Sequence, residues 1–307
     1  MSEEDRAALE AKAAEVTNGD SRFWRVEAPN GAVGHLFGTY HDTQAIETLT
    51  PPVRDAFDKA EGLVVELTES QVAAMEARLE ADPTFGFAAG PDTLGTRVAA
   101  QLSFDERATA ENAFAARGLS LSIASLLEPW LLFSMLGTPA CQLSEMRTGA
   151  PVLDRFLSEQ ASARDIDVVG LETYEAALGA FDAISPAEAE GLMRDMFVLA
   201  AHDEDIRRTM MAQYAEGRTG MISAFSTAAP EIIGVARKGA PLGSEALGDA
   251  FSEAILEKRN LAWMPGLTEA LSLPARFVAV GALHLPGEEG LVALLRAQGF
   301  TVTAVAE

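Results

Sequence analysis

The chain has 307 residues, 48% of them apolar and 22% charged, so it can bury a large core in one large domain or two small ones. Its 46 acidic and 23 basic residues give a formal charge of −23, which argues against nucleic acid and membrane surfaces as partners. A single cysteine excludes an intramolecular disulfide and a zinc cluster built from cysteines.

The N-terminal segment, residues 1–22, is polar and acidic and predicts a solvated lead-in. It contains no apolar run typical of a secretory signal. We therefore expect a cytoplasmic protein, or a periplasmic one if a leader was removed before this numbering begins. The most apolar stretch, residues 119–136, contains Glu128-Pro129 and predicts two buried helical pieces, not a membrane span.

The segment 23–68 has the pattern of strands around a helix. Two alternating runs, 23–27 and 33–39, predict a β-hairpin, because a Pro-Asn-Gly turn lies between them. A helix over 51–60 follows, with a threonine cap and a proline at its first position. Residues 63–67 then form an apolar run that is typical of a buried strand.

The long segment 69–250 predicts a mainly helical middle. Two capping boxes, each a serine followed by a glutamate three residues later, indicate helices that begin after Ser103 and Ser185. A strand over 167–171 follows a helix over 152–164.

The rest of the chain returns to alternating helices and strands. The expected elements are a loop or irregular crossing over 228–248, a helix over 251–271 interrupted at Pro265-Gly266, a strand over 276–280, a helix over 287–298 and a strand over 300–305. Together the patterns predict an α/β (α+β) fold in one domain, 23–307. Its central sheet is built from two βαβ-type units at the chain ends, 23–68 and 251–307, and the helical middle, 69–250, is inserted between them.

The two ends of the chain carry the same motif. An apolar strand runs into Gly-x-x-His at Gly38–His41 and again at Gly281–His284, and each motif precedes a helix and a second strand. Glycine lets the backbone turn sharply at the strand's end, and ligands in open α/β sheets bind outside the carboxyl ends of strands. We therefore expect His41 and His284 to face one crevice. The alternative for each is an ordinary core or loop histidine.

Several blocks of the sequence resemble the TraB/GumN family. In chain order they are LFGTYH at 36–41, LVVEL at 63–67, GLET at 170–173, KRN at 258–260 and VGALHLPG at 280–287. The family includes the TIKI-type metalloproteases and is distantly similar to the erythromycin esterases. The resemblance runs from residue 23 to the end, with a loose match over the middle helices.

The resemblance implies a divided α/β fold and a hydrolytic site at the two Gly-x-x-His motifs. Asp42 departs from the family pattern, since relatives commonly carry a small apolar residue directly after this histidine. The substrate range of relatives therefore does not transfer to this chain.

Four further polar residues occupy informative positions. Glu66 ends a buried strand, where a carboxylate is either solvated at the rim or paired with a cation or metal. Arg259 lies on the helix before the last motif, either as a surface residue, as a partner of Glu66 or as a group that stabilises an oxyanion. Glu172 follows the strand 167–171 in the same way, and its alternative role is to support the next helix. Asn260 is expected to anchor a loop through its side chain.

Two chemical schemes are open. In the first, His41, His284, Glu66 and Glu172 bind a divalent metal (zinc, manganese, cobalt or iron) whose open position activates water. In the second no metal is present: one histidine is the general base, Glu66 orients the water and Arg259 stabilises the oxyanion. The resemblance to TIKI proteins implies the first scheme, and the resemblance to erythromycin esterases implies the second.

The sequence therefore predicts a hydrolase, with the metal-dependent scheme favoured. It would cleave an amide, peptide or ester bond in a peptide or small-molecule substrate through His41, Glu66, Arg259 and His284. The competing hypothesis is a non-catalytic protein that holds a metal, a haem-like group or a small ligand in the same crevice. The sequence gives no indication of the oligomeric state.

Overall fold

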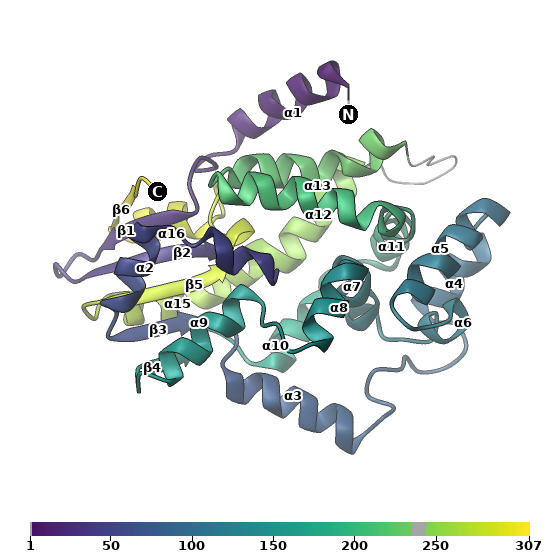
Figure 1. The fold of residues 1–307 in the computed structure, drawn as a ribbon, viewed down its shortest axis with the longest axis horizontal. Helices are drawn as coiled ribbons and strands as arrows, with labels where there is room; N and C mark the ends of the chain where they lie inside the picture. The colour runs from purple at the N-terminus through teal and green to yellow at the C-terminus, as the bar shows by residue number, and fades with distance from the viewer. Residues whose placement is uncertain (1, 235–243) are drawn as a thin grey trace.

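The computed structural model describes residues 2–234 and 244–307. In Figure 1 a β-sheet lies at one side of the molecule and a group of helices at the other. No helix within the two described ranges has the length and hydrophobicity needed to cross a membrane. Helices and one mixed sheet make up the fold, so the expected α/β (α+β) class is confirmed.

The sheet contains six strands in the described residues, in the order β4-β3-β5-β2-β1-β6. The strands are β1 (Phe23–Glu27), β2 (Val33–Thr39), β3 (Gly62–Val65), β4 (Asp167–Gly170), β5 (Arg276–Gly281) and β6 (Thr301–Ala304). β4, β3, β5 and β2 run parallel, whereas β1 pairs antiparallel with both β2 and β6. The carboxyl ends of these neighbouring parallel strands therefore meet at one edge of the sheet.

The two predicted end units are present, but they interleave. The first comprises β2, α2 (Pro51–Asp58) and β3, and the second comprises β5, α16 (Leu291–Ala297) and β6. β5 lies between β2 and β3, so the strands of the two units alternate within the sheet. The residues from Phe277 to Val280 are at most 1% exposed. A strand that is apolar on both faces needs neighbouring elements to cover both of them. A central position in the sheet provides that cover.

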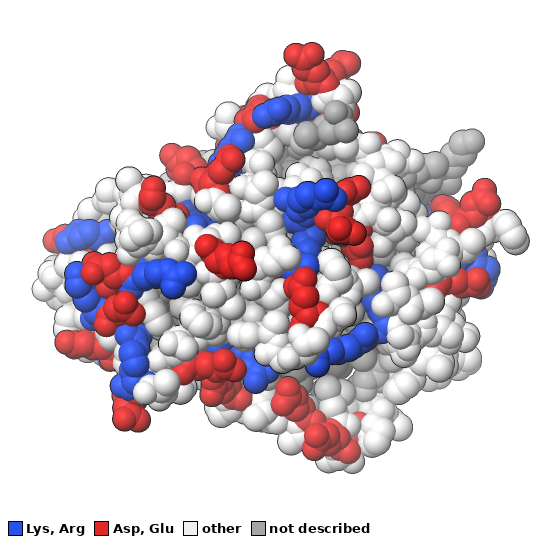
Figure 2. Space-filling view, viewed as in Figure 1, with Lys and Arg blue, Asp and Glu red and all other residues white. Residues whose placement is uncertain are grey.

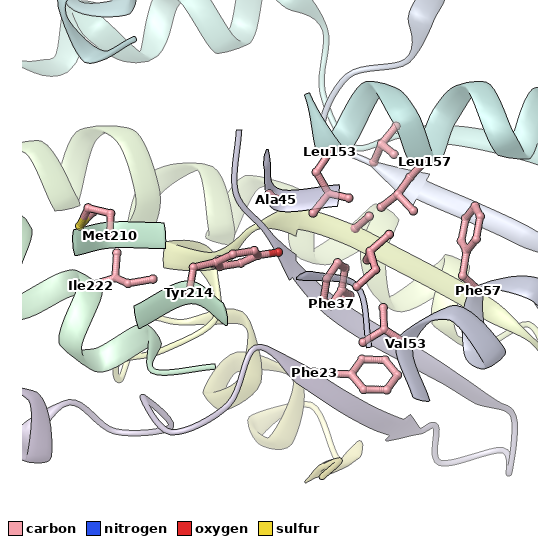
Figure 3. Close-up of a cluster of buried hydrophobic side chains, with 14 of the residues drawn as sticks. Phe23, Phe37, Ala45, Val53, Phe57, Leu153, Leu157, Met210, Tyr214 and Ile222 are labelled. Atoms are coloured by element: carbon pink, nitrogen blue, oxygen red, sulfur yellow. The ribbon is translucent and has the colours of Figure 1, made fainter. Parts of the chain in front are cut away.

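Side chains alternate between the two faces of the sheet, as the two-residue period of a strand requires. Phe37 of β2 packs on the face covered by α2 and α9 (Leu153–Ser162), among the aromatic and aliphatic side chains shown in Figure 3. Its neighbour Leu36 packs on the opposite face, against α15 (Lys258–Leu271) and α16, where Trp263 is buried. The site at the sheet edge thus stands on a core that is filled on both sides.

The helical middle has a core of its own, which buries Phe114, Leu132 and Phe197. Its remaining helices are α3 (Glu69–Ala81), α4 (Leu94–Gln101), α5 (Phe104–Ala116), α6 (Leu121–Ala124), α7 (Pro129–Gly137), α8 (Ala140–Arg147), α10 (Tyr174–Gly179), α11 (Pro186–Leu199), α12 (Asp203–Ala215), α13 (Thr219–Ile233) and α14 (Ser244–Ser252). The two predicted capping boxes are confirmed at Ser103 and Ser185. β4 leaves this region and joins the sheet beside β3.

Two local predictions in the second half of the chain are wrong in part. The expected loop over 228–248 is helical up to Ile233 and again from Ser244, and the rest of it, residues 235–243, lies outside the described residues. α15 continues through Pro265 without interruption. Leu261, whose carbonyl loses its helical partner to the proline, is 53% exposed, so solvent can satisfy that carbonyl.

The lead-in segment forms α1 (Glu3–Glu15), which packs against α13 and is drawn above it in Figure 1. Its single buried side chain, Leu9, joins the core on the α2 and α9 side of the sheet, and Glu10 pairs with Arg218. On the face seen in Figure 2, acidic and basic side chains are interspersed, with no large patch of one sign. The acidic excess therefore does not mark a binding surface on this face.

Candidate functional site

Four of the predicted site residues lie just beyond the carboxyl ends of the parallel strands. His41 follows β2, Glu66 follows β3, Glu172 follows β4 and His284 follows β5. Neighbouring parallel strands end at the same edge, so residues far apart in the sequence meet there. The interleaved strand order places the end of β5 between the ends of β2 and β3.

Gly281 is the point around which the site converges. A Cβ atom on Gly281 would lie 3.3 Å from Glu66 Oε1, 3.4 Å from His284 Cδ2 and 3.7 Å from His41 Nε2. Glu66 Oε1 accepts a hydrogen bond from the Gly281 N–H at 2.7 Å and lies 3.8 Å from His284 Nε2. The two histidines and Glu66 are therefore grouped closely enough to contact one small molecule.

His41 is held by side chains from the helical middle. Asp154 Oδ2, in the first turn of α9, accepts a hydrogen bond from His41 Nδ1 at 2.7 Å, and Asp154 Oδ1 accepts one from the Thr39 hydroxyl at 2.5 Å. Gln142 of α8 donates to the His41 carbonyl oxygen at 2.6 Å. The Asp154 carboxylate raises the pKa of His41 to about 9. The imidazole is 62% exposed, so it is a part of the site that an incoming molecule can contact.

His284 is held from the other side of the site, by α15. Asn260 Oδ1 lies 2.7 Å from His284 Nδ1, and the Asn260 amide donates to the carbonyl oxygens of His284 and Glu289. The Trp263 ring packs against the imidazole with 4.4 Å between the ring centres. The His284 side chain is 4% exposed, and burial lowers its pKa to about 3, so the ring is neutral at pH 7.

Arg259 is the centre of a buried ion cluster. Its guanidinium donates to Glu66 Oε2 at 2.7 Å and to Glu172 Oε1 at 2.5 Å, and its Nη1 lies 3.3 Å from His284 Nε2. It also stacks over the Trp263 ring at 4.7 Å. The side chains of Arg259, Glu66 and Glu172 are 15%, 14% and 6% exposed. Such charges are stable as a set, because removing one of them leaves the others buried and unpaired.

The charge on Glu66 depends on this cluster. Burial alone would raise the pKa of Glu66, but the neighbouring His284, Arg259 and His41 side chains outweigh burial and hold it at about 2. Glu66 is therefore ionised at neutral pH.

A helical irregularity precedes Arg259. The π-helical turn η4 (Glu253–Glu257) leads into α15, and the Ile255 carbonyl oxygen accepts a hydrogen bond from Arg259 Nη1 at 3.0 Å. A π-turn contains one residue more than an α-helical turn, so it rotates the side chains of the following helix about the helix axis. Such turns are frequent at functional sites. In this chain the face that follows carries Arg259, Asn260 and Trp263.

Asp42, the departure from the family pattern, has a structural role. Its carboxylate is 1% exposed and accepts two hydrogen bonds from Arg207 of α12, at 2.6 and 2.8 Å. Arg207 also binds Glu145 of α8 at 2.7 Å. A small apolar residue in place of Asp42 would leave a buried arginine short of a partner. The ion pair ties the loop after His41 to two helices of the middle.

The structure brings together the five residues that the sequence suggested for the site: His41, Glu66, Glu172, Arg259 and His284. Three contacting side chains carry no recognisable signal in the sequence: Asp154, Gln142 and Trp263. The nearest signal for Asp154 is its place in the first turn of a predicted helix. Asn260 anchors the loop after β5, as expected, and also holds His284.

The predicted metal ligands are largely engaged with one another. Glu66 and Glu172 both bind Arg259, and the described part of the chain contains no group of three or more His, Cys, Asp or Glu side chains placed to hold a metal ion. The four-residue ligand set therefore does not fit this arrangement, since Arg259 already supplies the positive charge that both carboxylates need. A smaller set of His41, His284 and Glu66 would require Arg259 to release Glu66.

A cavity of about 740 Å³ lies elsewhere, between α4, α5 and α6. Thr96, Arg107 and Ser120 are among the residues that line it, and none of the site residues does. This cavity is therefore separate from the histidine site, which rests on the convergence of side chains.

The fold and the site define a class of α/β protein in which two Gly-x-x-His strand ends meet at the carboxyl edge of a parallel sheet. The chain belongs to the TraB/PrgY/gumN family, whose profile matches residues 22–304. The match spans the sheet, the helical middle and every site residue, and it confirms the family that the sequence blocks indicated. No curated protein and no solved structure matches the chain.

Proposed function

We propose that this chain is a hydrolase that cleaves an amide, peptide or ester bond with water activated between His41, His284 and Glu66. The observation that carries the proposal is the convergence of His41 Nε2, Glu66 Oε1 and the His284 ring within 4 Å of one point at Gly281. Groups that exchange protons and are gathered around one position suit the activation of a single water molecule. Family membership by itself identifies neither the reaction nor the substrate.

His41 is the general base in this scheme, in the molecules whose ring is neutral. Because Asp154 raises the pKa of His41 to about 9, that neutral fraction grows as the pH rises towards 9. Its Nε2 takes a proton from water, while the Asp154 carboxylate stays bonded to Nδ1–H and stabilises the imidazolium that forms. The resulting hydroxide adds to the carbonyl carbon of the substrate. When the C–N or C–O bond breaks, His41 returns the proton to the leaving group. General acid–base catalysis of this kind contributes about 10²- to 10⁴-fold to the rate.

Glu66 and Arg259 support the reaction. Glu66 Oε1 accepts the second hydrogen of the water and so orients the lone pair that attacks. Arg259 keeps Glu66 ionised and in place, and its positive charge favours the negative charge that develops on the carbonyl oxygen.

One observation favours a metal-dependent version of the same proposal. Both imidazoles have an oxygen acceptor at Nδ1, Asp154 at one and Asn260 at the other, which is how metal-binding histidines are usually held. Zinc, manganese, cobalt or iron suits a mixed set of nitrogen and oxygen ligands. This version requires Glu66 to exchange Arg259 for the metal.

A non-catalytic binding protein is the second candidate. The extensive pairing of Arg259 with Glu66, Glu172 and the Ile255 carbonyl favours it, because a satisfied cluster leaves few groups free to respond to a transition state. In that case the exposed face of His41 would bind a ligand, and no reaction would follow.

The test is a panel of peptide, amide and ester substrates assayed with and without a chelator, alongside analysis of bound metal. We expect His41→Gln to lower kcat about 10²- to 10⁴-fold and His284→Gln to lower it also. The matched control is His202→Gln, an exposed histidine outside the site. Loss of activity with chelator and recovery with added metal supports the metal version. Hydrolysis that survives both site substitutions contradicts the proposal, and a wild type that binds ligands without hydrolysing them indicates the binding protein.

A further inference from the structure

The hydrogen-bond partner of His41 determines which of its nitrogens carries a proton. Asp154 Oδ2 is a carboxylate oxygen, which only accepts hydrogen bonds when ionised, so His41 Nδ1 must be the donor across their 2.7 Å contact. The second oxygen of Asp154 is occupied by the Thr39 hydroxyl, which holds the carboxylate in its orientation. A neutral His41 ring therefore has its lone pair on Nε2, the nitrogen that approaches Gly281.

The side-chain amide of Asn260 determines in the same way which nitrogen of His284 carries a proton. Both hydrogen bonds from Asn260 Nδ2 end on carbonyl oxygens, those of His284 and Glu289, at 3.2 and 2.9 Å. These two acceptors fix the orientation of the amide, so its oxygen must face the His284 ring and Nδ1 must donate to it at 2.7 Å. Arg259 Nη1, which can only donate, faces Nε2 at 3.3 Å and favours a lone pair there.

We infer that Asp154 and Asn260 are the positioning residues of the site, and that each holds its histidine in the Nδ1–H tautomer with the Nε2 lone pair turned inward. The inference rests on the proposed hydrolase function and adds a residue that the matching motifs do not contain. Asp154 comes from α9, 113 positions from His41, so the helical middle completes the site. The other tautomer would place a hydrogen on the nitrogen that must accept the proton of the water.

The direct test is a long-range ¹H–¹⁵N spectrum of the full-length protein, which reports the tautomer of each neutral imidazole. The chain has four histidines, so single His→Gln variants assign the signals. We expect the Nδ1–H form at His284, and at His41 once its ring is neutral. An Nε2–H form at either ring in the wild type overturns the inference, and this measurement requires no substitution at Asp154 or Asn260.

Substitution at Asp154 tests the functional part. In Asp154→Asn the amide NH₂ can donate to His41 Nδ1, which favours the wrong tautomer. The equivalent substitution behind the catalytic histidine of serine proteases costs about 10⁴-fold in kcat, and we expect a loss of about 10²- to 10⁴-fold with little change in KM. The matched control is Glu159→Gln, which removes a carboxylate of the same helix that pairs with the exposed Arg155. Equal kcat in the two variants overturns the inference.

Asn260 allows a conservative comparison. Asn260→Asp keeps an oxygen acceptor for His284 Nδ1, whereas Asn260→Leu removes it at similar volume. We expect the first variant to keep the Nδ1–H tautomer and the second to have a smaller Nδ1–H fraction, because only the Arg259 donor at Nε2 then favours that form. A His284 tautomer that is unchanged in a folded Asn260→Leu protein contradicts the assignment. If the wild type hydrolyses no substrate, the proposed function fails, while the tautomer spectra still decide the inference.

Discussion

The two Gly-x-x-His strand ends are alike in sequence and different in surroundings. His41 is 62% exposed and backed by a carboxylate, whereas His284 is 4% exposed and backed by an amide. As a result the pKa of His41 is raised to about 9 and that of His284 is lowered to about 3. A shared motif therefore places both rings at one edge of the sheet, and the neighbouring helices decide what each ring does.

The glycines of the two motifs differ in the same way. A Cβ atom on Gly38 would lie 2.8 Å from the Ala282 Cα, so this glycine allows β2 to pack against the backbone of the other motif. A Cβ atom on Gly281 would instead meet the functional ends of Glu66, His284 and His41 at 3.3 to 3.7 Å. One glycine serves the packing of the fold, and the other leaves room within the site.

The largest expected effect comes from breaking the buried cluster on the His284 side. Arg259→Ala leaves Glu66 and Glu172 buried without their cation and should lower the free energy of unfolding by about 3–5 kcal/mol. Urea unfolding at pH 7 measures the change. Arg208→Ala, which breaks an exposed ion pair with Asp205, is the control and should cost at most about 1 kcal/mol. Equal costs for the two variants would show that the cluster is not buried as described.

Substituting the two glycines should give smaller effects that differ in kind: Gly38 affects stability, and Gly281 affects kcat. Gly38→Ala should destabilise the fold by about 1–3 kcal/mol, because the Ala282 backbone cannot move aside easily. Gly281→Ala should change stability less but lower kcat, since displacing Glu66 or His284 by a fraction of an ångström disturbs the reacting geometry. Thermal unfolding and kinetics on both variants check the contrast. A Gly281→Ala protein with wild-type kcat would contradict the placement of the reacting water beside Gly281.

The smallest expected effect is a pH dependence of stability of opposite sign at the two histidines. His284 has a lowered pKa, so the unfolded chain takes up its proton first, and stability falls as pH falls from about 6.5 towards 3. At pH 5.5 the loss is roughly 1.4 kcal/mol, and His284→Gln should remove it. His41 has a raised pKa, so its contribution is present below pH 6.5 and is lost as pH rises through about 9. Denaturant unfolding between pH 5.5 and 9 measures both contributions. Identical curves of unfolding free energy against pH for His41→Gln and His284→Gln would contradict the difference between the two histidines.

Most of the site residues could be predicted from the sequence because they lie at strand ends. The apolar runs before Gly38 and Gly281 predict strands, and the residues after them predict a shared edge. Glu66 and Glu172 follow the same rule. Asp154 could not be found in this way, since an acidic residue in the first turn of a helix is common for reasons unrelated to function.

Local periodicity and residue type are enough to predict the strands, most of the helices, the capped helix starts at Ser103 and Ser185, the family and the repeated histidine motif. The place of β5 between β2 and β3, and the supply of partners to the two rings by α9 and α15, are known only from the folded chain. Strand order and side-chain pairing are set by which apolar faces bury one another over long separations in the chain. No local pattern records that choice.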